Sequence, residues 1–499
     1  MAESIGLRVD DPRFWDAGHL RSEVDRIFDV CAGCRLCFKF CGSFPRLFEA
    51  IDGKTASLRE AHLRAHPEIV AQAESRRAEA AAAPAVGEDA AHHGAEVGVT
   101  FGDELPEFEG HGRDLRAAEI DEIVDLCFQC KLCYPNCPYT PPHEFALDFP
   151  RLLLRWKAHR VRREGVPLRA RLMRDTARIG KASSLAPELA NYSLGNPLVR
   201  GAMRAVLAVH PDKRMPTYHR ETFPAWWKRH RPAAEEAQDL KEGVSAPTPL
   251  KVVLFSTCLI DYNDPAVGRA AVHVLEHNGV EVVVPDDQGC CGMPFLDGGD
   301  LEAAAGKIRH NVELLYPYVE RGYRIVIPSP SCSLMTREEY PQIVAGDRSA
   351  AVAAATHDLD EYLYRIAREG RLKRDFVRRF GSIRYHVPCH IRAQNVGIRG
   401  RDLLKLIADE VADVQECTGH DGTWSMHVDH FEDSLRWGKK AFDGMRVDAG
   451  EACALACTDC RLAALHIEQG AGRETVHPVV ALAHAYGFDV GAELQSRPA

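Results

Sequence analysis

The sequence predicts a helical α+β region at the N-terminus, followed by an α/β region whose parallel sheets form a pseudo-duplication. Two observations predict this fold. Residues 20–41 and 116–137 are two copies of one cysteine-bearing unit. After residue 250, short β-branched runs alternate with helical stretches, and this strand–helix–strand pattern occurs twice. The expected parts are a first domain over 1–150, a connector and linker over 151–249, and two α/β halves over 250–380 and 381–490.

Composition and charge limit the function classes. The chain has 499 residues, too many for one compact core, with 45% hydrophobic and 27% charged residues and a net charge of −10. This negative charge argues against a nucleic-acid partner. No apolar run reaches the ~18 residues that cross a bilayer, and no basic stretch followed by an apolar one marks a secretory signal. We therefore expect a cytoplasmic protein whose only membrane contact would be peripheral, on the inner face of the cytoplasmic membrane.

Each N-terminal copy predicts an amphipathic helix that leads to its first cysteine. Apolar residues and that cysteine recur at i, i+3, i+4 and i+7 in both copies: Val24, Ile27, Phe28, Cys31 and Ile120, Ile123, Val124, Cys127. Between the copies, the Ala-rich stretch 71–98 has the low complexity of an insertion.

Each copy then carries four cysteines in the spacing C-x2-C-x2-C-x3-C. They are Cys31, Cys34, Cys37, Cys41 and Cys127, Cys130, Cys133, Cys137. In bacterial two-cluster ferredoxins, the first three cysteines of such a run hold one 4Fe–4S cluster and the fourth reaches the other. The expected ligand sets are Cys31, Cys34, Cys37 with Cys137, and Cys127, Cys130, Cys133 with Cys41. A zinc site is the competing interpretation, but zinc usually pairs two CxxC units and leaves the third cysteine unused. The spacing therefore predicts a ferredoxin-like dicluster domain.

The connector is basic where it begins. Residues 151–181 hold eleven Lys or Arg against two acids, interleaved with leucines, and predict two basic amphipathic helices broken near 165–167. A polar, proline-bearing linker follows at 231–249. Three roles fit the basic segment: a solvated or internally packed face, a dock for an acidic partner, or a membrane-surface helix.

The two α/β halves follow from their strand patterns. Strands are expected at 251–256, 280–285 and 323–328, with helices at 266–278 and 300–321 between them. The second half repeats this order, with strands at 383–388, 411–416 and 451–457 and helices near 400–409 and 430–445. Both halves predict parallel sheets with right-handed crossovers.

A second set of cysteines follows these strands. They are Cys258, Cys290, Cys291 and Cys332 in the first half, and Cys389, Cys417, Cys457 and Cys460 in the second. The carboxyl ends of parallel strands meet at one sheet edge, where ligands bind. We therefore interpret these eight residues as ligands of one or two further clusters rather than as buried structural cysteines.

The motifs carrying these cysteines resemble those of the heterodisulfide reductase-related (CCG-domain) iron–sulfur proteins. Within that family they are similar to the C-subunit type of the anaerobic glycerol-3-phosphate dehydrogenases. The matching stretches are GCCGMPFLDGGDLEAA (289–304), PSCSLMTREEYP (330–341), HVPCHIRAQNVG (386–397) and ECTGHDGTW (416–424). The resemblance implies an iron–sulfur centre in the CCG half. Met335 and Thr418 stand where the five-cysteine pattern of heterodisulfide reductases has further cysteines, so four cysteines of the pattern remain in each half.

Histidines lie among these cysteines. His390 and His420 adjoin ligand positions and are the preferred catalytic candidates, as proton donors to a reducible acceptor. The competing interpretation is that the histidines only shape the loops through hydrogen bonds. Gly292, Gly419 and Gly422 are expected to serve backbone turns.

These observations predict an iron–sulfur electron-transfer subunit, an oxidoreductase component of a larger complex. Electrons would pass from a flavin-containing dehydrogenase subunit or another redox protein through two 4Fe–4S cubanes to the CCG centre. By resemblance, the acceptor is a quinone or a soluble partner such as a rubrerythrin-like protein. The alternative is a disulfide- or thiol-reducing enzyme of the heterodisulfide reductase type, against which the missing fifth cysteines weigh. A zinc scaffold without redox function is the third interpretation.

Overall fold

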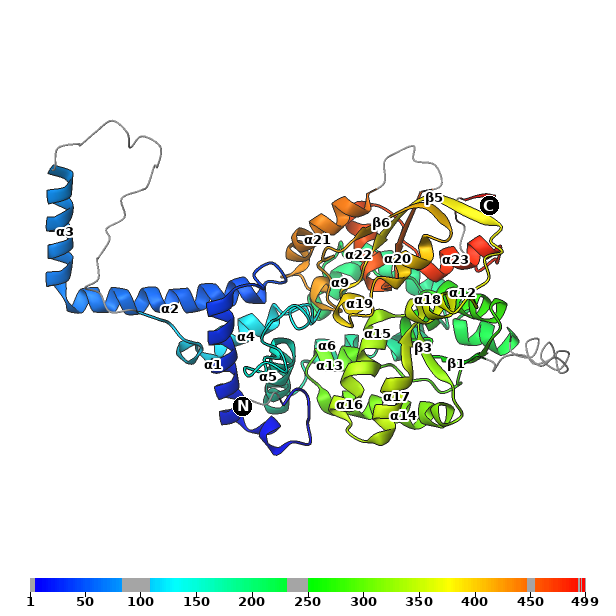
Figure 1. Cartoon of the computed structure of the whole chain (residues 1–499), viewed down its shortest axis with the longest axis horizontal. Helices are drawn as coiled ribbons and strands as arrows, with labels where there is room; N and C mark the ends of the chain where they lie inside the picture. Colours follow the sequence, from blue (N-terminus) through cyan, green and yellow to red (C-terminus); the bar gives the residue numbers. More distant parts are fainter. Residues whose placement is uncertain are drawn as a thin grey trace. The chain divides into compact units, whose positions relative to one another are not determined.

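A computed structural model describes residues 5–82, 108–230, 250–446, 454–491, 494 and 496–498 (Figure 1). The chain forms two compact units, which are treated separately below. The smaller unit is Arg21–Cys127, and the larger unit combines Met1–Leu20 with Phe128–Ala499. The first expected domain, 1–150, covers the smaller unit and parts of the larger one, and the expected domain boundaries stay a prediction.

The smaller unit is helical. Its elements are α1 (Ala17–Cys34, which begins in the larger unit), α2 (Ser43–Ala65), α3 (Pro67–Ala82), the short η2 (Gly112–Asp114) and α4 (Ala117–Asp125). The apolar faces expected from the sequence are buried on α1 and α4, since Val24, Ile27 and Phe28 on α1 are at most 2% exposed. Both helices that lead to the quartets are thus present.

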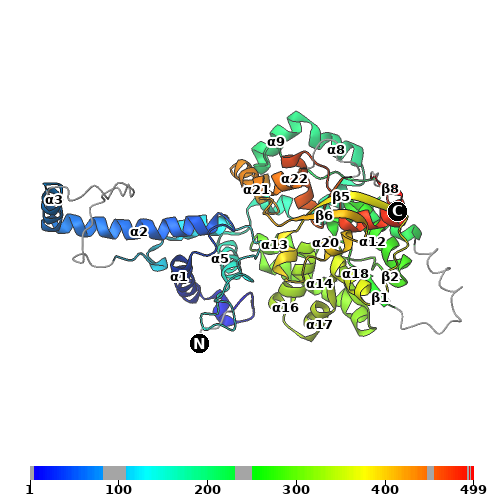
Figure 2. The same ribbon diagram turned by 45° about the horizontal axis from the view of Figure 1, so that its top comes forward.

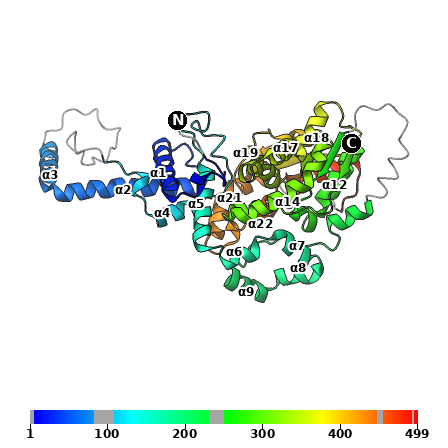
Figure 3. The same ribbon diagram turned by 90° about the horizontal axis from the view of Figure 1, so that it is seen from below.

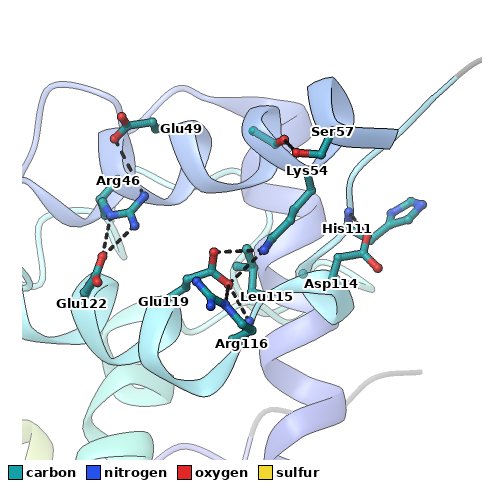
Figure 4. A network of polar contacts seen from close by, with 12 residues as sticks. Arg46, Glu49, Lys54, Ser57, His111, Asp114, Leu115, Arg116, Glu119 and Glu122 are labelled. Carbon is teal, nitrogen blue, oxygen red and sulfur yellow. Dashed lines mark hydrogen bonds and ion pairs between the residues drawn. The ribbon is translucent and has the colours of Figure 1, made fainter. Parts of the chain in front are cut away.

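Ion pairs between α2 and α4 fix the helix that leads to Cys127 (Figure 4). Arg46 lies 2.6 Å from Glu122, and Lys54 lies 3.0 Å from Glu119. The Glu119 carboxylate also accepts a hydrogen bond from the backbone N–H of Arg116, at the start of α4. This backbone bond and the Lys54 ammonium lower the pKa of Glu119 to about 2.

The Ala-rich stretch is partly helical. Residues 71–82 belong to α3, because alanine, glutamate and arginine are strong helix formers. The remainder of the expected insertion, 83–98, lies outside the described residues.

The larger unit contains two parallel sheets. The first has the order β2-β1-β3-β4 and is parallel throughout: β1 Leu250–Leu254, β2 Val280–Val283, β3 Arg324–Ile327 and β4 Thr356–Asp358. The second has the order β6-β5-β7, also parallel: β5 Arg378–His386, β6 Ala408–Val414 and β7 Leu455–Thr458. β8 (Arg497–Pro498) adds an antiparallel pair to β5. In both sheets the first strand is flanked by the second and the third.

Helices lie between and outside the two sheets (Figure 2). α12 (Pro265–His277), α18 (Leu359–Arg368), α20 (Arg399–Leu404) and α23 (Pro478–Tyr486) pack together between them and share one apolar core with β1 and β5. α14 (Leu301–Glu320) and α17 (Asp347–Ala355) cover the other face of the first sheet. α21 (Phe431–Met445) and α22 (Arg461–Ala471) cover the second. Shorter helices follow the strands: α11 Cys258–Tyr262, α13 Met293–Asp297, α15 Pro330–Leu334, the π-helix η3 Met335–Glu339, α16 Tyr340–Ile343, α19 Cys389–Ala393 and η4 Trp424–Met426.

The basic segment forms α5 (Phe149–Glu164), α6 (Leu168–Met173) and α7 (Thr176–Ser183), with the break at Gly165, whose φ is +79°. The first half of α5 is internal: Arg155 is buried and donates to the backbone carbonyl of Phe14 at 2.7 Å. α8 (Pro187–Gly195) and α9 (Pro197–Leu207) follow, and η1 (Pro12–Trp15) precedes α1.

Three details differ from the sequence-based expectation. The helix expected near 400–409 ends at Leu404, because β6 begins at Ala408 and pairs with β5. β4 is an additional strand of only three residues, too short to show the alternation that marks a strand. The expected strand at 451–457 begins at Leu455, and residues 451–453 lie outside the described residues.

Candidate functional site

Four thiols of the first half meet at the carboxyl edge of the first sheet. Cys258 begins α11 after β1, and Cys290 and Cys291 follow β2. Cys332 lies in the first turn of α15, after β3. Cys290 accepts hydrogen bonds from the thiols of Cys258 and Cys291, which lower its pKa well below the usual range. Cys291 also contacts Cys332. We name these four residues the first thiol group.

The two thiols that donate to Cys290, those of Cys258 and Cys291, have raised pKa values. Hydrogen bonding to Cys290, then burial, raises the pKa of Cys258 well above its usual range. The same contacts, with Cys332 as a second partner, raise the pKa of Cys291. Three buried cysteines and the partly buried Cys258 form a donor set suited to a soft metal centre, because thiolates are its natural ligands.

The backbone around the first thiol group supports this function. Gly292 follows the cysteine pair with φ +100°, and its N–H points to the Cys290 sulfur. A Cβ at Gly292 would lie 3.3 Å from the Met335 methyl group, so the loop and the start of η3 are closely packed. Met335, which replaces a cysteine of the longer motif, is fully buried there.

Three thiols of the second half form a second thiol group: Cys389, Cys417 and Cys460. Cys389 begins α19 after β5, Cys417 follows β6, and Cys460 caps α22 after β7. Burial raises the pKa of Cys389 well above its usual range, and the charges of Cys417 and Cys460 add to this effect. The Cys417 sulfur accepts from the N–H of Gly419 at 3.3 Å, and the Cys460 sulfur accepts from the N–H groups of Leu462 and Ala463. Such N–H···S bonds stabilise thiolate charge and tune cluster potentials.

Cys457 does not join the second thiol group. It lies on β7, fully buried in the apolar core between the sheets. After burial, Asp459 and Asp360 are the charged groups that raise its pKa, and no cysteine is among them. Successive residues of a strand point to opposite faces, so a C-x2-C spacing that spans a strand end does not bring both thiols together. The ligand role expected for Cys457 is not supported by its position.

The two thiol groups are neighbours. α15 and α19 pack against each other. The charge of Cys332 also contributes to raising the pKa of Cys460, after burial and Asp459. The carboxyl edges of the two sheets therefore face a common region.

The loop of the second quartet approaches the same region. The charge of Cys130 raises the pKa of Cys389, second only to burial. Gln129 and Lys131, on either side of Cys130, have φ of 50° and 58°. Arg35, directly after Cys34 in the first quartet, has φ 56°. Left-handed residues turn backbone N–H groups into concave nests that bind anionic centres, including iron–sulfur sites.

Contacts with distant residues hold the second-quartet loop in place. The imidazole of His390 bridges the backbone carbonyl of Gln129 at 3.0 Å and the hydroxyl of Ser331 at 2.9 Å. Lys131 is buried and forms an ion pair with Glu339 of η3. The Arg151 guanidinium of α5 also donates hydrogen bonds to both carboxylate oxygens of Glu339, at 3.0 and 3.1 Å. Phe128 packs edge-on against Trp424, with ring centroids 4.7 Å apart.

Glu339 is the centre of this buried network. Burial alone would raise its pKa, but the charges of Lys131 and Arg151 outweigh burial and lower the pKa to about 2. No sequence pattern singles out Glu339, which is 208 residues from Lys131. The sequence signal that could have indicated a buried acidic partner is Lys131 itself, a charged residue within a loop of cluster ligands.

The remaining quartet cysteines lie on the expected elements. Cys31 and Cys34 occupy the last turn of α1, and Cys37 and Cys41 follow in the turns before α2. Cys133 is buried, and the Cys137 sulfur accepts from the N–H of Tyr139 at 3.4 Å. The expected ligand sets, in which Cys137 completes the first-quartet cluster and Cys41 completes the second-quartet cluster, stay a prediction.

The two candidate histidines differ in what they contact. Both ring nitrogens of His390 are engaged, and burial lowers its pKa to about 4, so it is a neutral bridge at physiological pH. His420 is partly buried, and its Nε2 lies 3.9 Å from the Cys460 sulfur. Among the described residues, its Nδ1 has no hydrogen-bond partner. The geometry favours a positioning role for His390, whereas His420 retains a nitrogen for proton transfer.

Similarity to known proteins supports the same interpretation. The cysteine-rich CCG domain model matches residues 252–337 and 383–463, and the citrate utilization protein B Fer4-like domain model matches residues 105–163. The chain is 25% identical to the C subunit of the anaerobic glycerol-3-phosphate dehydrogenase of Escherichia coli K12, over 73% of this chain and 99% of the relative. It is 32% identical to lactate utilization protein A of Bacillus cytotoxicus, over 36% of this chain and 76% of the relative.

The matched CCG segments contain the seven cysteines of the two thiol groups, and the Fer4-like segment contains the second quartet. The arrangement of thiols and the relatives lead to one assignment. The chain belongs to the heterodisulfide reductase-related family of iron–sulfur proteins with CCG domains.

Proposed function

We propose that the chain is the electron-transferring subunit of a larger dehydrogenase or reductase. A flavin-containing subunit or similar donor would supply electrons to two 4Fe–4S clusters held by the quartets, and the CCG centre would deliver them to a quinone or soluble redox partner. Iron–sulfur clusters, when bound, supply one-electron redox chemistry. The observation that carries this proposal is the succession of cysteines from Cys130 through the second thiol group to the first. The Escherichia coli relative, which is by name a subunit of a dehydrogenase, supports a place within a larger complex.

The protein's own residues define what each part would do. The thiols and their backbone N–H donors would hold the clusters, and His390 with Glu339 would keep the second-quartet loop beside Cys389. The alternative proposal is reduction of a disulfide substrate at the CCG centre. His420, beside Cys460, supports it. Met335 and Thr418, which stand at two positions of the five-cysteine pattern, weigh against it.

The quartets predict the metal content. Anaerobically purified protein should contain at least about eight irons from the quartets alone, with matching sulfide, because each quartet spacing suits one 4Fe–4S cluster. Cys34→Ser and Cys130→Ser should each remove one cubane EPR signal and leave the other. Zinc in these sites after anaerobic expression would contradict the proposal.

The connector helices offer a docking surface. Along α6 to α9, which follow one another on the lower side of the larger unit in Figure 3, the described residues expose large apolar side chains. They are Leu168, Leu172, Leu185, Leu189, Tyr192, Leu198 and Val206. Exposed Arg169, Arg171, Lys181 and Arg204 lie among them. Apolar side chains beside cations suit an anionic lipid surface, and we propose peripheral contact there. None of the described helices is long and apolar enough to span a membrane.

Vesicle binding tests this surface. Leu189→Glu with Leu198→Glu should abolish cosedimentation with anionic vesicles, and rising salt should weaken binding of the unmodified chain, since surface charges are screened beyond about 8 Å. Leu58→Glu, at an exposed leucine of α2, is the matched control and should bind as before. Equal binding by the double variant, or binding only to a purified redox partner, would assign the surface to something other than lipid.

A further inference from the structure

A second kind of donor cluster lies between the two α/β halves, apart from the thiol groups. Asp360, Asp459 and His477 are all buried, and one donor atom of each lies within 4.8 Å of the others. Asp360 is on α18, which follows the first sheet. Asp459 follows β7, and His477 caps α23. The three residues therefore come from both halves of the chain.

The oxygens of this cluster lack donors. Among the described residues, neither carboxylate oxygen of Asp360 has a hydrogen-bond partner, although the residue is 2% exposed. The same holds for one oxygen of Asp459, while the other accepts from the Tyr385 hydroxyl at 2.5 Å. Buried carboxylates without partners are costly, so they require a cation or a proton.

Basic side chains do not fill this need. Burial raises the pKa of Asp360 most, followed by the charge of Asp459, a hydrogen bond between the two carboxyl groups, and the charge of Asp358. Within the described part of the chain, no cation is among these causes. Arg461 lines a small cavity together with Asp459 and His477, but it forms ion pairs with Asp264 at 3.5 Å and Glu468 at 3.0 Å. One proton shared between the two carboxyl groups would satisfy two of the three unpartnered oxygens.

We propose that Asp360, Asp459 and His477 bind a divalent metal ion of the zinc class, which joins the two halves of the CCG region. Two carboxylates and an imidazole are ligands that zinc accepts in proteins. The Tyr385 hydroxyl would orient the Asp459 carboxylate, as outer hydrogen bonds do at metal sites. A small cavity lies beside Asp459 and His477.

His477 requires one rearrangement. Its Nδ1 accepts the N–H of Val479 at 3.1 Å as the cap of α23, which leaves Nε2 for the metal. A metal on Nε2 moves the ring proton to Nδ1, at the expense of that capping bond. Burial lowers the pKa of His477 to about 4, so the ring is neutral and able to coordinate at physiological pH.

The test is zinc analysis of the full chain purified anaerobically with its iron intact. We expect about one zinc per chain whose X-ray absorption shows nitrogen and oxygen neighbours at about 2.0–2.2 Å, whereas zinc in cysteine sites shows sulfur at about 2.3 Å. Asp360→Asn should lower zinc occupancy at least tenfold without changing iron content. His477→Asn, which keeps a capping side chain, should do the same.

Asp358→Asn is the matched control. Asp358 is buried beside the cluster, but its oxygens already accept from the N–H of Asp360 and the hydroxyl of Ser333, so zinc should be retained. Removing zinc from the unmodified chain with a chelator should lower the melting temperature, and Zn²⁺ should restore it. Zinc bound only through sulfur, zinc retained by Asp360→Asn, or a melting temperature unaffected by chelation would each overturn the proposal in favour of a shared proton.

Discussion

Glu339→Gln is expected to destabilise the larger unit by about 3–5 kcal/mol, because it leaves two buried cations without their shared counter-ion. Glu339 is fully buried, and Lys131 is 4% exposed. Arg151 would keep its ion pair with Asp148 at 3.0 Å. Among the described residues Lys131 has no second ion pair, and the charges of Asp297 and Glu338 act on it only without direct contact. Denaturant unfolding of the anaerobic protein measures the loss.

Comparison with a neighbouring glutamate distinguishes loss of the Glu339 ion pairs from a general effect of removing a negative charge. Glu338→Gln should cost far less, because Glu338 is only half-buried and lies 3.4 Å from Arg151. Since Lys131 lies between Cys130 and Cys133, Glu339→Gln should also weaken the EPR signal of the second-quartet cluster. A variant as stable as the unmodified chain, with an unchanged signal, would show that the loop is held by other contacts.

The same network predicts a pH dependence. The pKa of Glu339 falls from an ordinary 4.5 to about 2 on folding. A depressed folded-state pKa stabilises the folded state above the unfolded-state pKa, and the contribution is lost as pH falls from about 4.5 toward 2. Its size is roughly 3 kcal/mol, at 1.36 kcal/mol per pKa unit. Glu339→Gln should therefore flatten the acid side of the stability profile.

Local patterns allowed most of the fold to be predicted. The strands after residue 250 and the helices that lead to both quartets follow from side-chain periodicity, which depends only on neighbours in the sequence. Spacing also indicated which cysteines follow strands. It did not indicate the face on which each thiol lies: Cys460 is at a helix cap beside the other thiols, whereas Cys457 is inside the core.

Contacts across long separations could not be predicted. His390 meets Gln129 over 261 residues, and Lys131 meets Glu339 over 208. Nothing local to a histidine or a glutamate shows which distant backbone it will face. The cluster of Asp360, Asp459 and His477 exists only because α18, β7 and α23 converge, so no local sequence pattern relates these three residues.

Cys290→Ala is expected to reduce electron delivery to the acceptor by about 100-fold or more, since even outer-shell changes at metal sites cost 10–100-fold. Cys290 accepts from Cys258 and Cys291, so its removal takes the shared thiolate out of the first thiol group. About four irons should be lost if this group holds one 4Fe–4S cluster. The cubane EPR signals of the quartets should remain, because their ligands are separate residues.

Cys457→Ala is the decisive comparison. Spacing predicts that Cys457 is a ligand, whereas its burial beside Tyr385, Asp459 and Asp360 predicts that it is not. We expect its replacement to leave iron content and electron delivery unchanged and to lower stability by about 1 kcal/mol or less, as a small cavity in the core does. Iron loss in Cys457→Ala equal to that in Cys290→Ala would make Cys457 a ligand, and β7 would then have to turn its thiol toward Cys389 and Cys460 when the cluster assembles.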